Sequence, residues 1–287
     1  MIEYKMAKSN KKRLYCLVDT ETTKHNGLVF DFAYNFRDRQ GYSYAKNSFL
    51  FKDVLAIEDP FYKEKIAEYW TLVWKHKIKP VTVKVARRHF NFMVEQFQKK
   101  NYEIVICAYN AAFDIRVLGE TSRDKVGVPW LTKDVANNGV KMFDLWHGWV
   151  MGCPKDYGET AAMSDKGNIR TSAEEVFRYE SKNPSFVERH VAFSDIIIED
   201  IILSKILARK KKLHIVDNPK LFAAHPWKIA QERCRAAIEY RKQKQLSMQT
   251  VIETIGLETI SKDHRIKQSM VDRVEDTSLY NLPEIGD

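Results

Sequence analysis

The chain is organised around one apolar stretch that ends in acidic residues, Leu14-Tyr15-Cys16-Leu17-Val18-Asp19-Thr20-Glu21. A short apolar run followed by polar residues and Gly27 predicts a buried central strand that leaves the sheet after Glu21. Because side chains alternate faces along a strand, Asp19 and Glu21 point to the same side. Two such carboxylates repel each other and lose hydration, which a divalent metal between them would relieve. Taken alone, the pair is a weak signal and is also typical of the solvated polar end of a strand.

Two later segments each supply one more acid. The run 103–109 predicts a strand, and the helix expected from residue 111 places Asp114 about one turn into it. His190 lies in a loop, and Asp195 opens a long helix expected over 195–212. Four carboxylates without cysteine form the oxygen set that Mg²⁺ or Mn²⁺ prefers. Two such ions can activate a water against a phosphodiester, and His190 can accept the proton because imidazole titrates near neutral pH.

The ordered motifs Asp-x-Glu-Thr-Thr, Asn-x-x-Phe-Asp and His-x-Ala-x-x-Asp occupy residues 19–23, 110–114 and 190–195. This set resembles the DEDDh exonucleases of the DnaQ-like family over roughly residues 13–212. The resemblance implies an α/β, RNase H-like fold with a mixed five-stranded sheet flanked by helices. It further implies two metal ions, Mg²⁺ or Mn²⁺, and removal of nucleotides from 3′ ends.

The resemblance also implies roles for individual residues. The implied metal ligands are Asp19, Glu21, Asp114 and Asp195, and the implied general base is His190. Thr22, Thr23 and Asn110 correspond to contacts with the terminal nucleotide. The tyrosine subtype carries Tyr four residues before the last acid, where this chain has Val191, so the histidine subtype is favoured.

Two domains are expected. Residues 1–212 form the exonuclease domain, in which strands at 28–36 and 42–51 make an antiparallel meander and 59–80 is a helical insertion. A further amphipathic helix is expected over 82–100. Residues 213–287 form a helical, basic C-terminal extension, with a helix at 227–244 and a polar tail beyond residue 256.

Composition sets broader limits. The 287 residues are 44% hydrophobic, which is enough to bury a real core. The net charge of +9 suits a polyanionic partner held around an acidic pocket, although ordinary solvated surface charge gives the same number. The four cysteines lack metal or disulfide spacing, and Cys16 and Cys107 fit buried strand positions. No apolar run is long enough for a membrane span or a signal core, so a soluble, cytoplasmic protein is expected.

These observations predict a metal-dependent 3′–5′ exonuclease that acts on DNA or RNA ends, with single strands favoured. Such a role fits replication or repair, with a polymerase or another replication protein as a possible partner. One alternative is a catalytically silent nucleic-acid-binding or polymerase-associated protein that uses the basic run 209–212 and the helix 227–244. A structure-specific endonuclease on the same fold is another. Four acids facing a phosphate chain favour an enzyme over a binding module.

Overall fold

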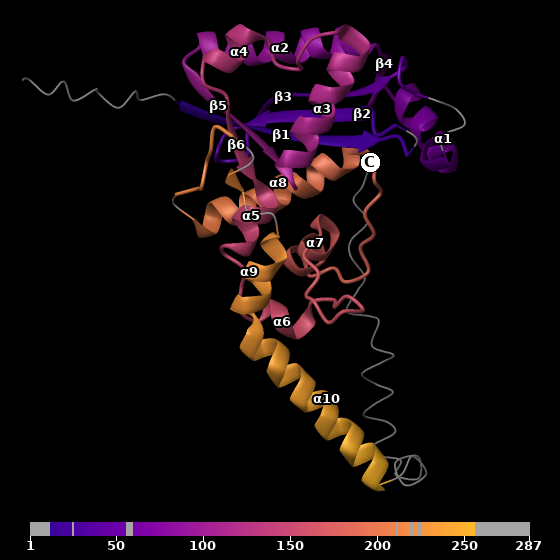
Figure 1. The fold of residues 1–287 in the computed structure, drawn as a ribbon, viewed down its shortest axis with the longest axis vertical. Coiled ribbons are helices and arrows are strands. Elements are labelled where there is room, and N and C mark those ends of the chain that lie inside the picture. Colours follow the sequence, from indigo (N-terminus) through magenta and orange to yellow (C-terminus); the bar gives the residue numbers. More distant parts are fainter. Residues whose placement is uncertain are drawn as a thin grey trace, which may run out of the picture. The chain divides into compact units, whose positions relative to one another are not determined.

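One mixed β-sheet runs through the part of the chain that the structure describes (Figure 1). The structure is a computed structural model and describes residues 12–24, 26–55, 60–210, 212–218, 221–222 and 225–255. Within these residues six strands lie in the order β4-β3-β2-β1-β5-β6. Their bounds are β1 Lys12–Thr22, β2 Val29–Arg37, β3 Ser43–Phe51, β4 Lys79–Val81, β5 Tyr102–Ala108 and β6 Lys141–Asp144.

Strand β2 alone runs against its neighbours. It is antiparallel to β1 and β3, whereas β1 with β5, β5 with β6, and β3 with β4 are parallel. This is the mixed α/β arrangement with flanking helices that the sequence predicts, with the expected meander in β1, β2 and β3. The fold class is therefore confirmed, and β4 adds a sixth strand to the expected five.

The extra strand comes from the segment expected to be a helical insertion. Helix α1 covers only Pro60–Trp74, and Lys79–Val81 pairs with β3 from Phe49 to Phe51. His76 adopts a left-handed backbone with φ 55°, which ends the helical path. Pro80 fits because an edge strand tolerates a residue that cannot donate a ladder hydrogen bond. The segment 59–80 is thus helical first and extended at its end, and Asp59 lies outside the described residues.

Helices cover both faces of the sheet (Figure 1). On one face lie α2 Val83–Lys99, α3 Ala111–Val126 and α4 Lys133–Asn137; on the other lie α5 Leu145–Val150 and α8 Ala192–Arg209. The core between sheet and helices is rich in aromatic rings. Every residue of β2 is buried, and four of them are Phe or Tyr. Phe32 of β2 meets Phe90 of α2 edge to face, with ring centroids 5.6 Å apart. Such packing fixes the sheet against α2 and α3.

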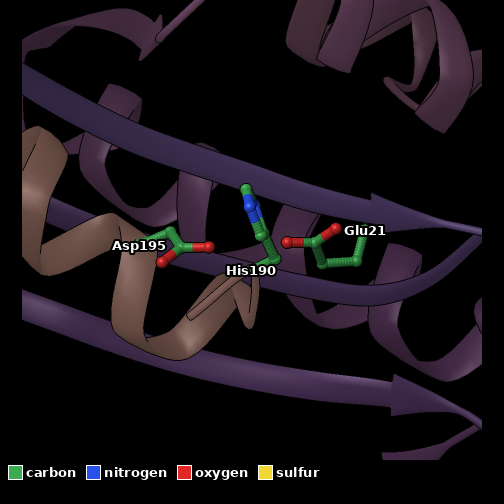
Figure 2. A group of neighbouring side chains, drawn as sticks. All are labelled: Glu21, His190 and Asp195. Atoms are coloured by element: carbon green, nitrogen blue, oxygen red, sulfur yellow. The ribbon is translucent and has the colours of Figure 1, made fainter. Parts of the chain in front are cut away.

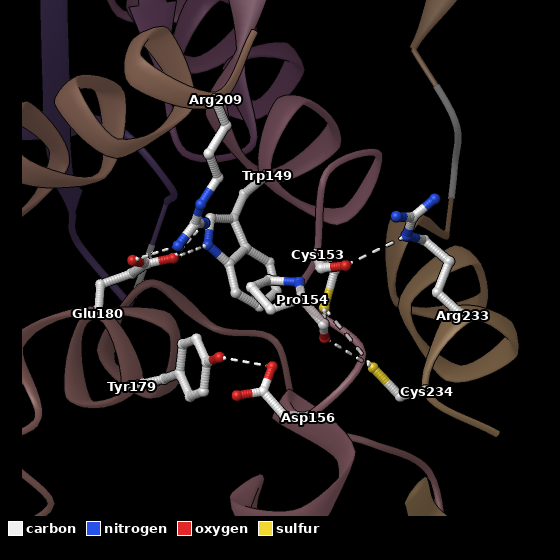
Figure 3. Close-up of polar contacts among 9 residues, drawn as sticks. All are labelled: Trp149, Cys153, Pro154, Asp156, Tyr179, Glu180, Arg209, Arg233 and Cys234. Carbon is white, nitrogen blue, oxygen red and sulfur yellow. Dashed lines mark hydrogen bonds and ion pairs between the residues drawn. The ribbon is translucent and has the colours of Figure 1, made fainter. Parts of the chain in front are cut away.

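The remaining helices are α6 Tyr157–Thr160, α7 Ala173–Ser181, α9 Pro226–Arg233 and α10 Arg235–Ile255. The single helix expected over 227–244 is therefore two helices, with a break at Cys234. The thiol of Cys234 lies 3.7 Å from that of Cys153, and both thiols donate to the Pro154 carbonyl oxygen at 3.4 Å (Figure 3). All four cysteines are buried and are free thiols, not disulfides. A contact with a distant loop, which a sequence pattern does not display, holds the helix end at this point.

A buried carboxylate joins α5, α7 and α8 (Figure 3). Glu180 accepts a hydrogen bond from Trp149 Nε1 at 2.7 Å and from Arg209 Nη2 at 2.8 Å. The start of α7 is capped by Ser172, whose Oγ accepts the N–H of Glu175 at 3.3 Å. These bonds fix α7 beside α8.

The chain forms two compact units, Met1–Cys234 and Arg235–Asp287. Helix α9 belongs to the first unit, in which it contacts α5, and α10 belongs to the second. A domain boundary at residue 212 stays a prediction, and the expected polar tail beyond residue 256 lies outside the described residues. Among the described residues, every helix is too short or too polar to cross a lipid bilayer.

Candidate active site

The C-terminal end of β1 carries Asp19 and Glu21 on one face of the sheet. Strand β1 pairs with β5 as far as Leu17, and beyond that residue its described ladder continues only with β2. Helix α3 contacts the strand end, where Thr20 Oγ1 donates to Asp114 Oδ1 at 2.7 Å. The end of the strand and the first turn of α3 are thus fixed together.

The start of α3 orients Asp114. Asn110 precedes the helix with a left-handed φ of 71°, and its own side chain makes no capping hydrogen bond. The N–H of Ala111 instead donates to Asp144 Oδ2 at 2.9 Å, so the end of β6 caps the helix. Held in this way, Asp114 is only 4% exposed and lies against β1.

Helix α8 begins at Ala192, three residues before the start expected at Asp195. The N–H of Ala192 donates to Asp31 Oδ2 at 2.9 Å, and the same oxygen accepts the Tyr69 hydroxyl at 2.9 Å. The prediction is wrong at this boundary because the cap comes from β2, far away in the sequence. Asp195 therefore lies within the first turn of α8 and is 3% exposed.

His190 meets two of the acids immediately before α8. The possible ligand atoms of Glu21, His190 and Asp195 all lie within 4.8 Å of one another, and Figure 2 shows the imidazole between the two carboxylates. The His190 backbone is left-handed, with φ 51°, and its side chain is 55% exposed. Lys65 of α1 donates to the His190 carbonyl oxygen at 2.9 Å, so the helical insertion supports this loop.

A fifth carboxylate, Glu199, faces the same place and is absent from the prediction. Its Oε1 accepts the Tyr109 N–H at 2.7 Å, and the residue is 2% exposed. Glu199 follows Asp195 by four residues, which puts both acids on one face of α8. An acid within the apolar run after Asp195 was the available signal. We call Asp19, Glu21, Asp114, Asp195 and Glu199 the carboxylate cluster.

The cluster resists ionisation as it stands. Burial first, and then the neighbouring acids Asp31 and Asp195, raise the pKa of Glu21 to about 9. Burial and Glu188 raise the pKa of Asp195 to about 8. Burial raises the pKa of Asp114 to about 7, although the Thr20 hydroxyl lowers it in part. The pKa of Asp19 is raised well above its usual range by burial and then by Glu199.

Three of these acids keep oxygens that no described residue satisfies. The shielded atoms Asp19 Oδ2, Asp195 Oδ1 and Glu199 Oε2 have no hydrogen-bond donor among the described residues. A buried carboxylate oxygen without a donor is costly unless a cation approaches it. The raised pKa values and the missing hydrogen-bond donors thus agree: the carboxylate cluster has too little neighbouring positive charge to offset its acids.

The residues expected to contact a terminal nucleotide differ in their surroundings. Thr22 is half-buried where β1 leaves its register with β2. Thr23 is buried, and its hydroxyl contacts Asn26 Oδ1 and the Leu28 carbonyl oxygen, so this side chain closes a turn. Asn110 is exposed at the start of α3. Of the three, Asn110 presents the most accessible side chain.

Comparisons with known proteins give structural neighbours only. No protein-family model and no curated protein matches the chain. Escherichia coli Exonuclease I in complex with a dA16 oligonucleotide has a TM-score of 0.45 at 14% identity, covering 69% of this chain and 41% of that one. An apo Exonuclease I gives 0.46 at 15% identity, covering 70% and 43%. An ExoI/SSB-Ct complex gives 0.46 at 14%, covering 70% and 42%. This chain therefore matches less than half the length of those proteins.

Proposed function

We propose that the protein is a metal-dependent 3′–5′ exonuclease that hydrolyses phosphodiester bonds at the ends of nucleic acid strands. The observation that supports this proposal best is the approach of Glu21, His190 and Asp195, whose possible ligand atoms lie within 4.8 Å of one another. These residues come from the end of β1 and from the start of α8, which the sheet and the Asp31 cap hold in place.

The residues fit divalent metal ions of the magnesium type. The donors are carboxylate oxygens, three of which are shielded and lack a hydrogen-bond donor among the described residues. Oxygen donors of this kind suit Mg²⁺ or Mn²⁺. Asp19, Glu21, Asp114 and Asp195 would hold two such ions. When bound, the ions supply a nucleophilic water at neutral pH and offset the charge of the phosphodiester.

His190 is the proposed general base. Burial and the charge of Lys65 lower the pKa of His190, which favours the neutral imidazole that can accept a proton. Its Nδ1 lies 4.0 Å from Glu188 Oε2, and a carboxylate there favours the tautomer with the proton on Nδ1. Nε2 then accepts the proton of the attacking water. The water oxygen forms a bond to phosphorus as the bond from phosphorus to the 3′ oxygen of the preceding nucleotide breaks. That 3′ oxygen takes up a proton from solvent, and a nucleoside 5′-monophosphate is released.

A silent binding protein is a weaker proposal. Part of the basic run assigned to that role is already engaged, because Arg209 pairs with the buried carboxylate of Glu180. A binding surface for phosphates also gains nothing from shielded acids without donors. The enzymatic proposal uses those acids.

The decisive test is digestion of a 5′-labelled single-stranded oligonucleotide with Mg²⁺, with and without chelator. We expect a ladder that shortens from the 3′ end only when metal is present. Internal fragments from a circular single strand would support an endonuclease instead. Binding without any product would support the silent protein and overturn the proposal.

A further inference from the structure

A pocket beside the carboxylate cluster is not used by the proposed chemistry. It has a volume of about 610 Å³ and lies within the unit Met1–Cys234. We call it the tryptophan pocket, and its defining lining residues are Tyr109, Asn110, Trp146, Arg170, Thr171 and Trp227. They come from four separate parts of the chain, so the pocket is formed by the tertiary fold and not by a local sequence motif.

One wall is a rigid aromatic platform. Trp146 stacks on Tyr109 with ring centroids 6.2 Å apart and an interplanar angle of 17°. Trp146 Nε1 donates to Thr171 Oγ1 at 2.7 Å, and the Tyr109 hydroxyl donates to the Thr171 carbonyl oxygen. Thr171 is 3% exposed, so the polar atoms of both rings are engaged inside the protein. What Trp146 offers a ligand is therefore a ring face, which suits stacking.

The second tryptophan brings positive charge with it. Trp227 lies on α9, and α9 is attached to the pocket edge because Ile169 N–H donates to Gln231 Oε1 at 3.0 Å. Lys228 Nζ lies 5.7 Å from the centre of the Trp227 ring, and Arg170 is exposed at the lining. Of the described residues that line the pocket, none is acidic. Aromatic faces with neighbouring cations match an aromatic ring that is linked to phosphate.

The pocket and the carboxylate cluster are linked through Tyr109 and Asn110. Asn110 lines the pocket and immediately precedes α3, which carries Asp114 in its first turn. The N–H of Tyr109, whose ring forms the pocket wall, donates to Glu199. Residues 109 and 110 therefore connect the pocket wall directly to two acids of the cluster, Asp114 and Glu199.

We propose that the tryptophan pocket takes one unpaired nucleobase of the strand whose 3′ end lies at the carboxylate cluster. This inference rests on the proposed nuclease function and names its substrate class. A base that stacks on Trp146 or Trp227 must have left its base pair and its neighbours in the strand. The pocket thus restricts the enzyme to single-stranded ends. Stacking tolerates every base, so no sequence preference follows.

The test measures binding in chelator, where hydrolysis is absent, with a labelled dT12 strand and with the same strand carrying one abasic site at each position in turn. In the wild-type protein we expect one position at which removal of the base weakens binding about tenfold or more, with loss of the tryptophan fluorescence quenching that intact dT12 produces. In Trp227→Ala, intact dT12 binds correspondingly weakly, and the abasic site at that position costs nothing further. Trp227→Phe keeps a ring face and restores most of the affinity.

Controls separate this proposal from the one on which it rests. Trp74→Ala removes a tryptophan that is 82% exposed on α1, and it should leave binding unchanged. A blunt duplex should bind weakly to the wild type and to Trp227→Ala alike, and a uridine strand should behave like dT12. If no abasic position weakens wild-type binding, the pocket proposal is overturned even if Mg²⁺-dependent cleavage occurs. If the abasic effect appears but no cleavage occurs, the nuclease proposal fails and the base pocket stands.

Discussion

Strands β1 and β6 each carry an aspartate after apolar residues, but the two aspartates differ in their hydrogen bonds. Asp144 ends β6, where Oδ1 accepts the His147 N–H at 2.8 Å and Oδ2 accepts the Ala111 N–H at 2.9 Å. Asp19 near the end of β1 has a shielded Oδ2 with no donor among the described residues. Backbone N–H groups limit the rise in the pKa of Asp144 to about 6, whereas the pKa of Asp19 rises far more. Both oxygens of Asp144 thus receive donors from the fold, whereas one oxygen of Asp19 receives none among the described residues.

The largest expected effect is that of Asp19→Asn. Removing this charge should lower Mg²⁺-dependent cleavage by about a thousandfold or more, since cation binding contributes several kcal/mol to such transition states. In chelator the same variant should melt at a higher temperature than the wild type, because Asn at this buried position does not have to take up a proton on folding, as Asp19 does. Calorimetry with Mn²⁺ should show weakened binding. Unchanged Mn²⁺ affinity would exclude Asp19 as a ligand, and the exposed Asp134→Asn is the control.

The next largest effect is expected at His190, the only base in the group with Glu21 and Asp195. His190→Ala should lower turnover by about a hundredfold to ten-thousandfold, with strand binding in chelator unchanged. His190→Asn is the matched variant, because Asn tolerates the left-handed backbone at this position and cannot act as the base. Near-normal turnover in the Asn variant would remove the histidine from the mechanism.

Glu199 shares features of Asp144 and of Asp19. Its Oε1 accepts the Tyr109 N–H, whereas its Oε2 has no hydrogen-bond donor among the described residues. Glu199→Gln keeps an acceptor for Tyr109 and removes the charge, so Mn²⁺ affinity should fall by about tenfold while stability in chelator rises. Glu199→Ala should instead destabilise the fold by about 1–3 kcal/mol, because it leaves the Tyr109 N–H unpaired. Equal Mn²⁺ affinity in the wild type and the Gln variant would show that Glu199, like Asp144, serves only to accept a backbone N–H.

Asp144→Asn should have the converse result. Asn offers one acceptor oxygen to two N–H donors, so the free energy of unfolding should fall by about 1–3 kcal/mol. Mn²⁺ affinity of the folded protein should stay close to that of the wild type. Chemical denaturation and calorimetry on the same sample measure both quantities. A variant that keeps its stability and loses Mn²⁺ would place Asp144 with the carboxylate cluster.

The effect with the smallest consequence for cleavage is a dependence of stability on pH in the absence of metal. Folding raises the pKa of Glu21 to about 9 and of Asp195 to about 8, whereas unfolded carboxyls titrate near 4. The folded state therefore binds more protons than the unfolded state in this window, and stability should fall as the pH rises from about 5 to 9. Melting temperatures in chelator at pH 5, 7 and 9 test this. Saturating Mg²⁺ should flatten the slope above pH 6, and an identical slope with Mg²⁺ would argue against metal at these acids.

The sequence predicted those parts of the molecule that local periodicity controls. The alternation of Asp19 and Glu21 on one strand, the meander after it and the helix that follows residue 82 all depend on neighbouring residues. The histidine and two of its acids were predicted from the same motifs, and the structure brings them together.

What the sequence left open depends on contacts between distant residues. Helix α8 starts at Ala192 only because Asp31 caps it from β2, and Asp144 differs from Asp19 only because two helices begin beside it. Strand β4 and the tryptophan pocket likewise need partners far along the chain. The apolar pattern predicted most of the strands and helices, since that pattern depends on spacing within one element. Tertiary structure decided which buried carboxylate oxygens receive a hydrogen-bond donor, because the donors come from other elements.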